Sequence, residues 1–217
     1  MPHRRAQPVE SDRAVNSPFA DLSSQAICAF HDERVAQLDR APISAAAEAS
    51  EAWQWIEADH RCNTLLWDEE DLARRTEVPD AAIAANKRAI DGYNQRRNDA
   101  IEKIDEALLA RIAGVTPREN AWHNSETAGA MIDRLSILAL RLRHMTKQTE
   151  RTDVAPAHIA SCREKLARLI QQRADLARCL DTLLTRAGEG RAFWRIYRQF
   201  KMYNDPELNP YLHGGKR

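Results

Sequence analysis

The chain has 217 residues, of which 43% are hydrophobic and 29% charged; this suits one globular domain and excludes wholesale disorder. Seven glycines and nine prolines are too few for an all-β chain with a turn about every ten residues. Thirty-two basic and 32 acidic residues cancel to a formal net charge of zero. Because nucleic-acid binding needs a basic excess, we expect no nucleic-acid partner.

The chain carries no signal for a membrane or for export. No apolar run reaches the roughly 18 residues of a membrane span, and residues 1–20 lack the apolar stretch of a signal peptide. The four cysteines form no CxxC pair and lie far apart, at Cys28, Cys62, Cys162 and Cys179. We therefore expect a cytoplasmic protein with reduced thiols and no membrane span.

Helical periodicity, with its start and stop signals, predicts an all-α, single-domain bundle of five to six long antiparallel helices. Residues 1–18 are expected to be a disordered tail, residues 19–212 the bundle and residues 213–217 a disordered end. Ser44 is the expected N-cap of the second helix, and Gly188 and Gly190 are expected to stop the fifth. The predicted helices cover residues 19–38, 44–75, 81–113, 124–149, 156–187 and 191–203.

The second and third predicted helices carry polar residues on faces that should be apolar. In residues 44–75, a face that begins at Trp53 and Ile56 continues through Asn63, Trp67 and Glu70. The third helix has an apolar stripe of Ile83, Ile90, Ile101, Ile104, Leu108 and Ile112, in which Asn94 and Arg97 also fall. Because an unpaired buried amide or guanidinium costs several kcal/mol, these groups must meet polar partners from other helices.

The fourth predicted helix is apolar nearly all round, which is typical of a central, buried helix. Asp133 and His144 lie on one side of it, too far apart along the helix for a direct hydrogen bond. Its start, at Asn124 to Gly129, exposes free backbone N–H groups that favour a phosphate or a carboxylate.

These segments resemble a bacterial domain-of-unknown-function family, numbered 4254. The resemblance lies in residues 124–140 with His144-Met145, in Trp67-Asp68-Glu69-Glu70-Asp71, in residues 87–102 and in residues 199–210. It covers roughly residues 50–212, and where members often have Trp-His-Glu-Glu-Asp this chain has Asp68 in place of the histidine. The resemblance implies an all-helical protein without an established activity, and an association with cell-envelope glycosyltransferases, near which some members are encoded.

The leading hypothesis is that the polar cluster binds an anionic small molecule, such as a nucleotide, a sugar nucleotide or a sugar phosphate. The acids Glu70, Asp71 and Glu102 are the candidate catalytic residues, and Glu70 and Asp71 are candidate ligands for Mg²⁺. The candidate ligand-binding residues are Asn63, Trp67, Lys87, Asn94, Arg97, Asn98, Asn124, Arg134 and Lys201. Whether the protein is an enzyme stays open at this point.

The alternative is a non-catalytic accessory protein for a cell-envelope glycosyltransferase. In that case the polar cluster would be a closed structural network that fixes the register of the helices. A cleft that opens onto the cluster would favour the first hypothesis, because a ligand needs a mouth through which to enter.

Overall fold

The computed structural model describes residues 17–38, 50–198, 207–209 and 211. The predicted N-terminal tail of residues 1–18 lies outside these ranges except for residues 17 and 18. The predicted end at residues 213–217, the predicted N-cap at Ser44 and Lys201 also lie outside them. The described residues form five helices and one pair of short strands. They are α2 (Ser24–Gln37), α3 (Glu51–Leu72), α4 (Asp80–Arg111), β1 (Trp122–His123), α5 (Ala128–Thr149), α6 (Pro156–Gly188) and β2 (Ala192–Phe193).

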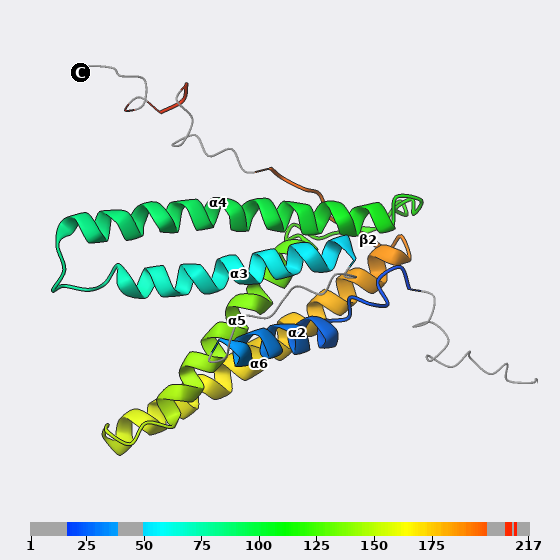
Figure 1. Cartoon of the computed structure of the whole chain (residues 1–217). Helices are drawn as coiled ribbons and strands as arrows, with labels where there is room; N and C mark the ends of the chain where they lie inside the picture. The colour runs from blue at the N-terminus through cyan, green and yellow to red at the C-terminus, as the bar shows by residue number, and fades with distance from the viewer. Residues whose placement is uncertain (1–16, 39–49, 199–206, 210, 212–217) are drawn as a thin grey trace, which may run out of the picture.

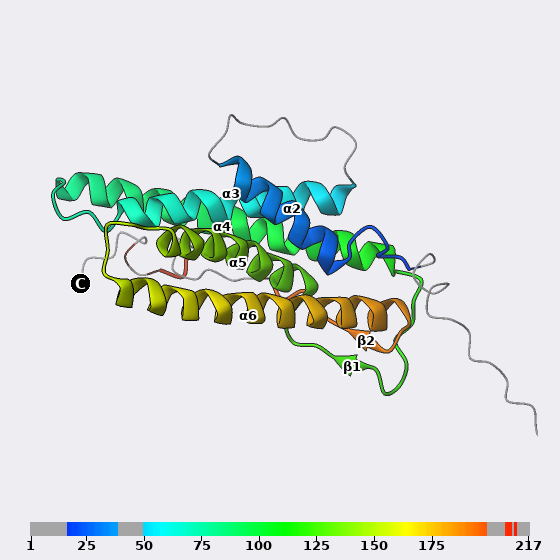
Figure 2. The same ribbon diagram turned by 90° about the horizontal axis from the view of Figure 1, so that it is seen from below.

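Two antiparallel helical hairpins make up most of the fold. Helices α3 and α4 run side by side as one hairpin, and α5 and α6 form the second (Figure 1). The shorter α2 packs against α5 and α6 (Figure 2). Helix α5 contacts all four of the other helices, which confirms the predicted central helix. The all-α bundle predicted from the sequence is therefore the observed fold.

The core lies around α5 and is closed by leucine and isoleucine side chains from every helix. Each fully buried side chain of this kind stabilises the fold by about 1.5–3 kcal/mol relative to an exposed one. The largest fully buried apolar residues are Leu22, Ile27, Ile56, Ile104, Leu108, Ile132, Leu135, Leu140, Leu180 and Leu183. None of the described helices combines the length and the apolar character needed to cross a membrane.

The helix ends differ from the predicted ones by a few residues, for local reasons. Ser23 caps α2, since its side chain accepts a hydrogen bond from the N–H of Ala26, so the helix begins after residue 19. Thr127 caps α5 in the same way, by accepting from the N–H of Ala130, and α5 therefore begins later than Asn124. Pro156 occupies the first turn of α6, as predicted.

The predicted last helix, over residues 191–203, is wrong for its described part. Gly190 takes a positive φ of 69°, which turns the chain back beside the loop before β1. Residues Ala192 and Phe193 then pair in parallel with Trp122 and His123. The side chains of Ala192 and Trp194 enter the core, so burial at every second residue overrides the helical tendency of this segment.

Candidate functional site

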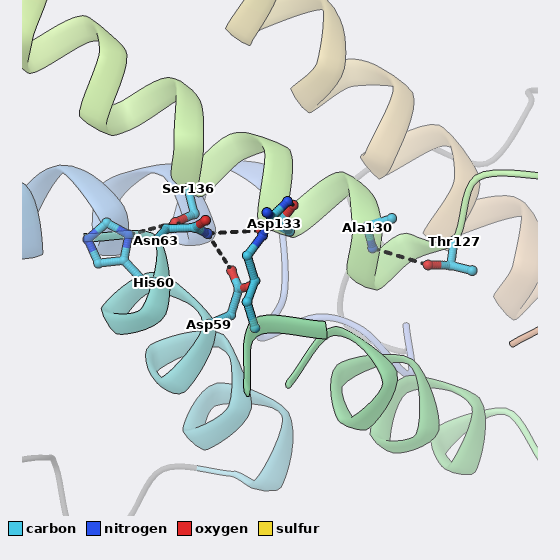
Figure 3. A network of polar contacts seen from close by, with 8 residues as sticks. Asp59, His60, Asn63, Thr127, Ala130, Asp133 and Ser136 are labelled. Carbon is cyan, nitrogen blue, oxygen red and sulfur yellow. Dashed lines mark hydrogen bonds and ion pairs between the residues drawn. The ribbon is translucent and has the colours of Figure 1, made fainter. Parts of the chain in front are cut away.

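A buried polar cluster lies inside the bundle, where α2, α3, α4 and α5 meet. Figure 3 shows His60 and Asn63 of α3 facing Asp133 and Ser136 of α5, with Asp59 one turn away from Asn63. We use "polar cluster" for seven residues: His31, Asp59, His60, Asn63, Arg97, Asp133 and Ser136. All but Arg97 are buried. Of the polar residues that the sequence placed on these faces, Asn63 and Arg97 therefore belong to an interior network, whereas Glu70 does not.

Arg97 and Asp133 form the charged centre of this cluster. The Nε and one terminal nitrogen of Arg97 each donate to one oxygen of Asp133, both at 2.7 Å. The amide of Asn63 donates to Asp133 at 2.9 Å and lies 3.1 Å from the hydroxyl of Ser136. The polar partner that the sequence required for Arg97 is thus the Asp133 carboxylate of α5, and this pairing is bidentate.

Asp59 is a fully buried carboxyl group close to Asp133. Burial raises the pKa of Asp59 well above its usual range, and the nearby Asp133 raises it further, against the opposing charge of Arg97. One oxygen of Asp59 lies 3.3 Å from the amide nitrogen of Asn63, and the other has no hydrogen-bond partner among the described residues. Two carboxyl groups can share this interior because Arg97 forms its hydrogen bonds with Asp133, while the raised pKa of Asp59 favours its uncharged form.

The rings of His31 of α2 and His60 of α3 stack face to face where the two helices meet. Their ring centroids are 5.0 Å apart and the ring planes differ by 21°. Burial lowers the pKa of His31 well below its usual range and that of His60 to about 4, so both imidazoles are neutral at pH 7. Nδ1 of His60 lies 2.8 Å from the hydroxyl of Ser136, whereas its Nε2 has no partner in the described part of the chain.

The N-terminus of α5 receives a carboxylate from the protein itself. Asp105 of α4 accepts a hydrogen bond of 2.8 Å from the N–H of Gly129, in the first turn of α5. Burial raises the pKa of Asp105 to about 6, although hydrogen bonds from Thr127 and Gly129 oppose this. The anion that the sequence suggested for these N–H groups is therefore the Asp105 side chain, which fills the position of a phosphate.

The opposite pKa shifts of His60 and Asp105 predict opposite pH effects on stability. Between pH 6.5 and about 4, only the unfolded chain binds a proton at residue 60, so His60 makes the protein less stable as the pH falls. Between pH 6 and 3.8 the folded chain binds the extra proton at Asp105, so Asp105 makes the protein more stable as the pH falls. Each effect amounts to about 3 kcal/mol at most.

The test is urea unfolding of His60→Gln and Asp105→Asn at several pH values from 4 to 7. From pH 7 to pH 4, the stability of the wild type relative to His60→Gln should fall, and its stability relative to Asp105→Asn should rise. Gly92→Ala, which removes no titrating group and contacts neither His60 nor Asp105, should differ from the wild type by the same amount at every pH. Parallel pH curves for all three variants would contradict both assignments.

A groove of about 550 Å³ opens where the end of α3 meets the α5–α6 hairpin. Three cationic side chains line it, Arg141 of α5 and Lys165 and Arg168 of α6, together with a single carboxylate, Asp71. The remaining lining residues are Trp67, His144, Met145, Gln148, Leu169 and Gln172. The groove is therefore a cationic site with apolar walls, and it contains two residues predicted from the sequence, Trp67 and Asp71.

One wall of the groove is a pair of stacked rings from the two hairpins. The rings of Trp67 and His144 are 4.2 Å apart at their centroids and 18° from parallel. Burial lowers the pKa of His144, as does the nearby Arg143, while Asp71 opposes the shift. His144 is therefore neutral at pH 7 and presents a flat aromatic surface instead of a charge.

The predicted acids are not brought together. Glu70 pairs at 2.9 Å with Arg74, four residues later and just beyond the end of α3, and it does not line the groove as Asp71 does. Glu69 bonds to Asn86 of α4, and Glu102 follows Asn86 by 16 residues, which places Glu102 about 24 Å farther along α4. Among the described residues, no group of three or more His, Cys, Asp or Glu side chains could hold a metal ion.

The eight described members of the predicted ligand-binding set lie in four places. Asn63 and Arg97 belong to the polar cluster, and Asn94 and Asn98 are half-buried beside Arg97 on α4. At the start of α5, Asn124 donates to the carbonyl of Glu126, whose side chain pairs with Arg134. Lys87 is exposed and pairs with Asp91 on its own helix. Among the members of this set that the structure describes, only Trp67 lines the groove.

The sequence did not identify several residues of the polar cluster and of the groove. Asp59 was identifiable, because it precedes Asn63 by four residues and so shares its face of α3. His31 and Ser136 carried no such signal, since His31 is directly followed by three charged residues typical of an exposed face and Ser136 is one small hydroxyl among apolar residues of α5. The groove cations Arg141, Lys165 and Arg168 look like ordinary surface residues until the packing of α5 on α6 is known.

Comparison with known proteins agrees with the resemblance drawn from the sequence. No curated protein and no solved structure matches the chain. A family model described as "Protein of unknown function (DUF4254)" matches residues 53–196. This range contains the whole groove and every residue of the polar cluster except His31. Because the matched segment spans well over half of the sequence, the chain belongs to the DUF4254 family.

Proposed function

We propose that the protein binds an anionic small molecule, such as a nucleotide, a sugar nucleotide or a sugar phosphate, in the groove between α3, α5 and α6. The observation that carries this proposal is the charge of the groove, which has three cations and one carboxylate in a protein of zero net charge. Its volume of about 550 Å³ also suits a ligand of this size.

The three cations are available to a ligand. In the described part of the chain, Arg141, Lys165 and Arg168 form no ion pair, whereas many other arginines pair with a carboxylate, as Arg173 does with Asp32. Three cations around the single carboxylate of Asp71 leave an excess of positive charge, and a bound phosphate relieves the repulsion between them. The groove therefore favours a ligand with at least two negative charges.

Asp71 is the only predicted catalytic acid that lines the groove. Mg²⁺ is commonly bound by one or two carboxylates together with the phosphates of a substrate. Asp71 would fit that role for a metal ion that arrives with a phosphorylated ligand. Metal-assisted phosphate chemistry is thus part of the proposal through Asp71, and not through Glu70 or Glu102.

Reversing one groove charge should weaken the binding of a simple anion. Arg168→Glu is expected to lower the affinity for pyrophosphate about tenfold or more, because a charge-assisted hydrogen bond of about 1.5–3 kcal/mol is lost. The measurement is isothermal titration calorimetry on the full chain.

The matched control is Arg163→Glu, which makes the same change of net charge on an exposed residue of α6 outside the groove. It should bind pyrophosphate as the wild type does. Equal losses in both variants, or no binding by the wild type, would refute a specific anion site in the groove.

The polar cluster favours a second role. Its charged members are satisfied mainly by one another, as Arg97 is by Asp133, and this is expected of a network that fixes helix register. We therefore keep, as the alternative, a non-catalytic partner of a cell-envelope glycosyltransferase. A chain that binds no anion but co-purifies with such an enzyme would favour it.

A further inference from the structure

We infer that the ligand of the groove is a nucleoside phosphate, whose base lies against the Trp67–His144 pair and whose phosphates meet the three cations. This inference rests on the proposed function and narrows it. Sugar phosphates satisfy the charge of the groove but lack a planar ring. Two other features of the groove favour a nucleoside phosphate over a sugar phosphate.

The first feature is the aromatic wall. Trp67 and His144 come from different hairpins and are already stacked at 4.2 Å, so a third planar ring extends a surface that is preformed. Met145 and Leu169 add apolar surface in the same groove. Stacking of a base on an aromatic side chain contributes about 1–3 kcal/mol, which a sugar phosphate cannot gain.

The second feature is the order of side chains along α5. Arg141, His144 and Gln148 follow one another at intervals of three and four residues, so they share one face of the helix. From Arg141 to Gln148 the helix rises about 10 Å. A cation, a ring and an amide in this order match the phosphate, the base and the hydrogen-bonding edge of a nucleotide, since an amide both donates and accepts.

The test compares nucleotides with ligands that lack the base. The affinities of AMP, UMP, ribose 5-phosphate and pyrophosphate are measured by calorimetry on the full chain. At least one nucleotide should bind about tenfold or more tightly than ribose 5-phosphate. Equal affinities would overturn the inference and leave the proposed function standing, whereas no binding of any anion would overturn both.

Single substitutions in the groove test where the base of the nucleotide lies. Trp67→Leu should lower nucleotide affinity about tenfold, leave pyrophosphate binding unchanged, and be largely rescued by Trp67→Phe, which retains a ring. Trp122→Leu is the matched control, because Trp122 is exposed and lies outside the groove. If Trp67→Leu does not fold, Gln148→Leu serves instead, with a selective loss of nucleotide binding expected. A nucleotide that binds equally well to all these variants would contradict the placement of the base.

Discussion

Replacing Asp133 with alanine is expected to lower the free energy of unfolding by about 3–5 kcal/mol, the usual effect of removing one member of a buried ion pair. The change leaves the guanidinium of Arg97 without its two 2.7 Å hydrogen bonds. It also takes away the closest acceptor of the Asn63 amide. Urea unfolding followed by circular dichroism at pH 7 measures the loss.

The adjacent residue supplies the control. Arg134 also forms an ion pair, with Glu126, but on the surface, where such pairs contribute about 0–1 kcal/mol. Arg134→Ala should therefore change stability by less than about 1 kcal/mol. If Asp133→Ala cost no more than Arg134→Ala, the cluster would not stabilise the fold, and its role as a register-fixing network would be ruled out.

Gly129→Ala is expected to destabilise the protein by about 1–3 kcal/mol, the range found for overpacked interiors. A Cβ at this position would lie 2.6 Å from the carbonyl oxygen of Ile101 and 2.8 Å from an oxygen of Asp105. The Ile101 oxygen is held by the backbone of α4, and the Asp105 carboxylate is held through its other oxygen, which accepts from the Gly129 N–H. Thermal and urea unfolding both report the effect.

Gly92→Ala is the matched control, because it makes the same change inside α4 at a position where a Cβ meets nothing within 4 Å. There, alanine should stabilise the helix by up to about 1 kcal/mol. The two substitutions thus have opposite expected signs. A stabilising Gly129→Ala would show that α4 and α5 do not approach as closely as the structure indicates.

Residues that repeat along one helix were predictable, because a face is fixed by the helical period alone. The isoleucine stripe of α4 and the apolar character of α5 gave the core and the central helix. The same reasoning placed Asn63 and Arg97 inside, where both are found in one network. The hairpin of α3 and α4 followed from the short turn between them, and the Glu69–Asn86 bond joins its two helices near that turn.

Contacts between separate helices were not predictable, because one sequence does not fix how far two helices slide or rotate against each other. The stacking of His144 on Trp67 depends on where the second hairpin crosses α3. The groove cations of α6 depend on its rotation against α5. Residues 192–194 were mispredicted as helical because their place in the core, beside a strand 70 residues earlier, overrides local preference.

The borders of the family match do not coincide with the borders of the folding unit. Helix α2 precedes residue 53, yet it inserts Ile27, His31 and Val35 into the interior. A recombinant fragment trimmed to residues 53–196 would expose to solvent the face of α5 that α2 covers. It would also remove His31, on which the ring of His60 stacks. Biochemical work on this protein should therefore keep the chain from Ser17 onward, so that α2 still covers α5 and α6.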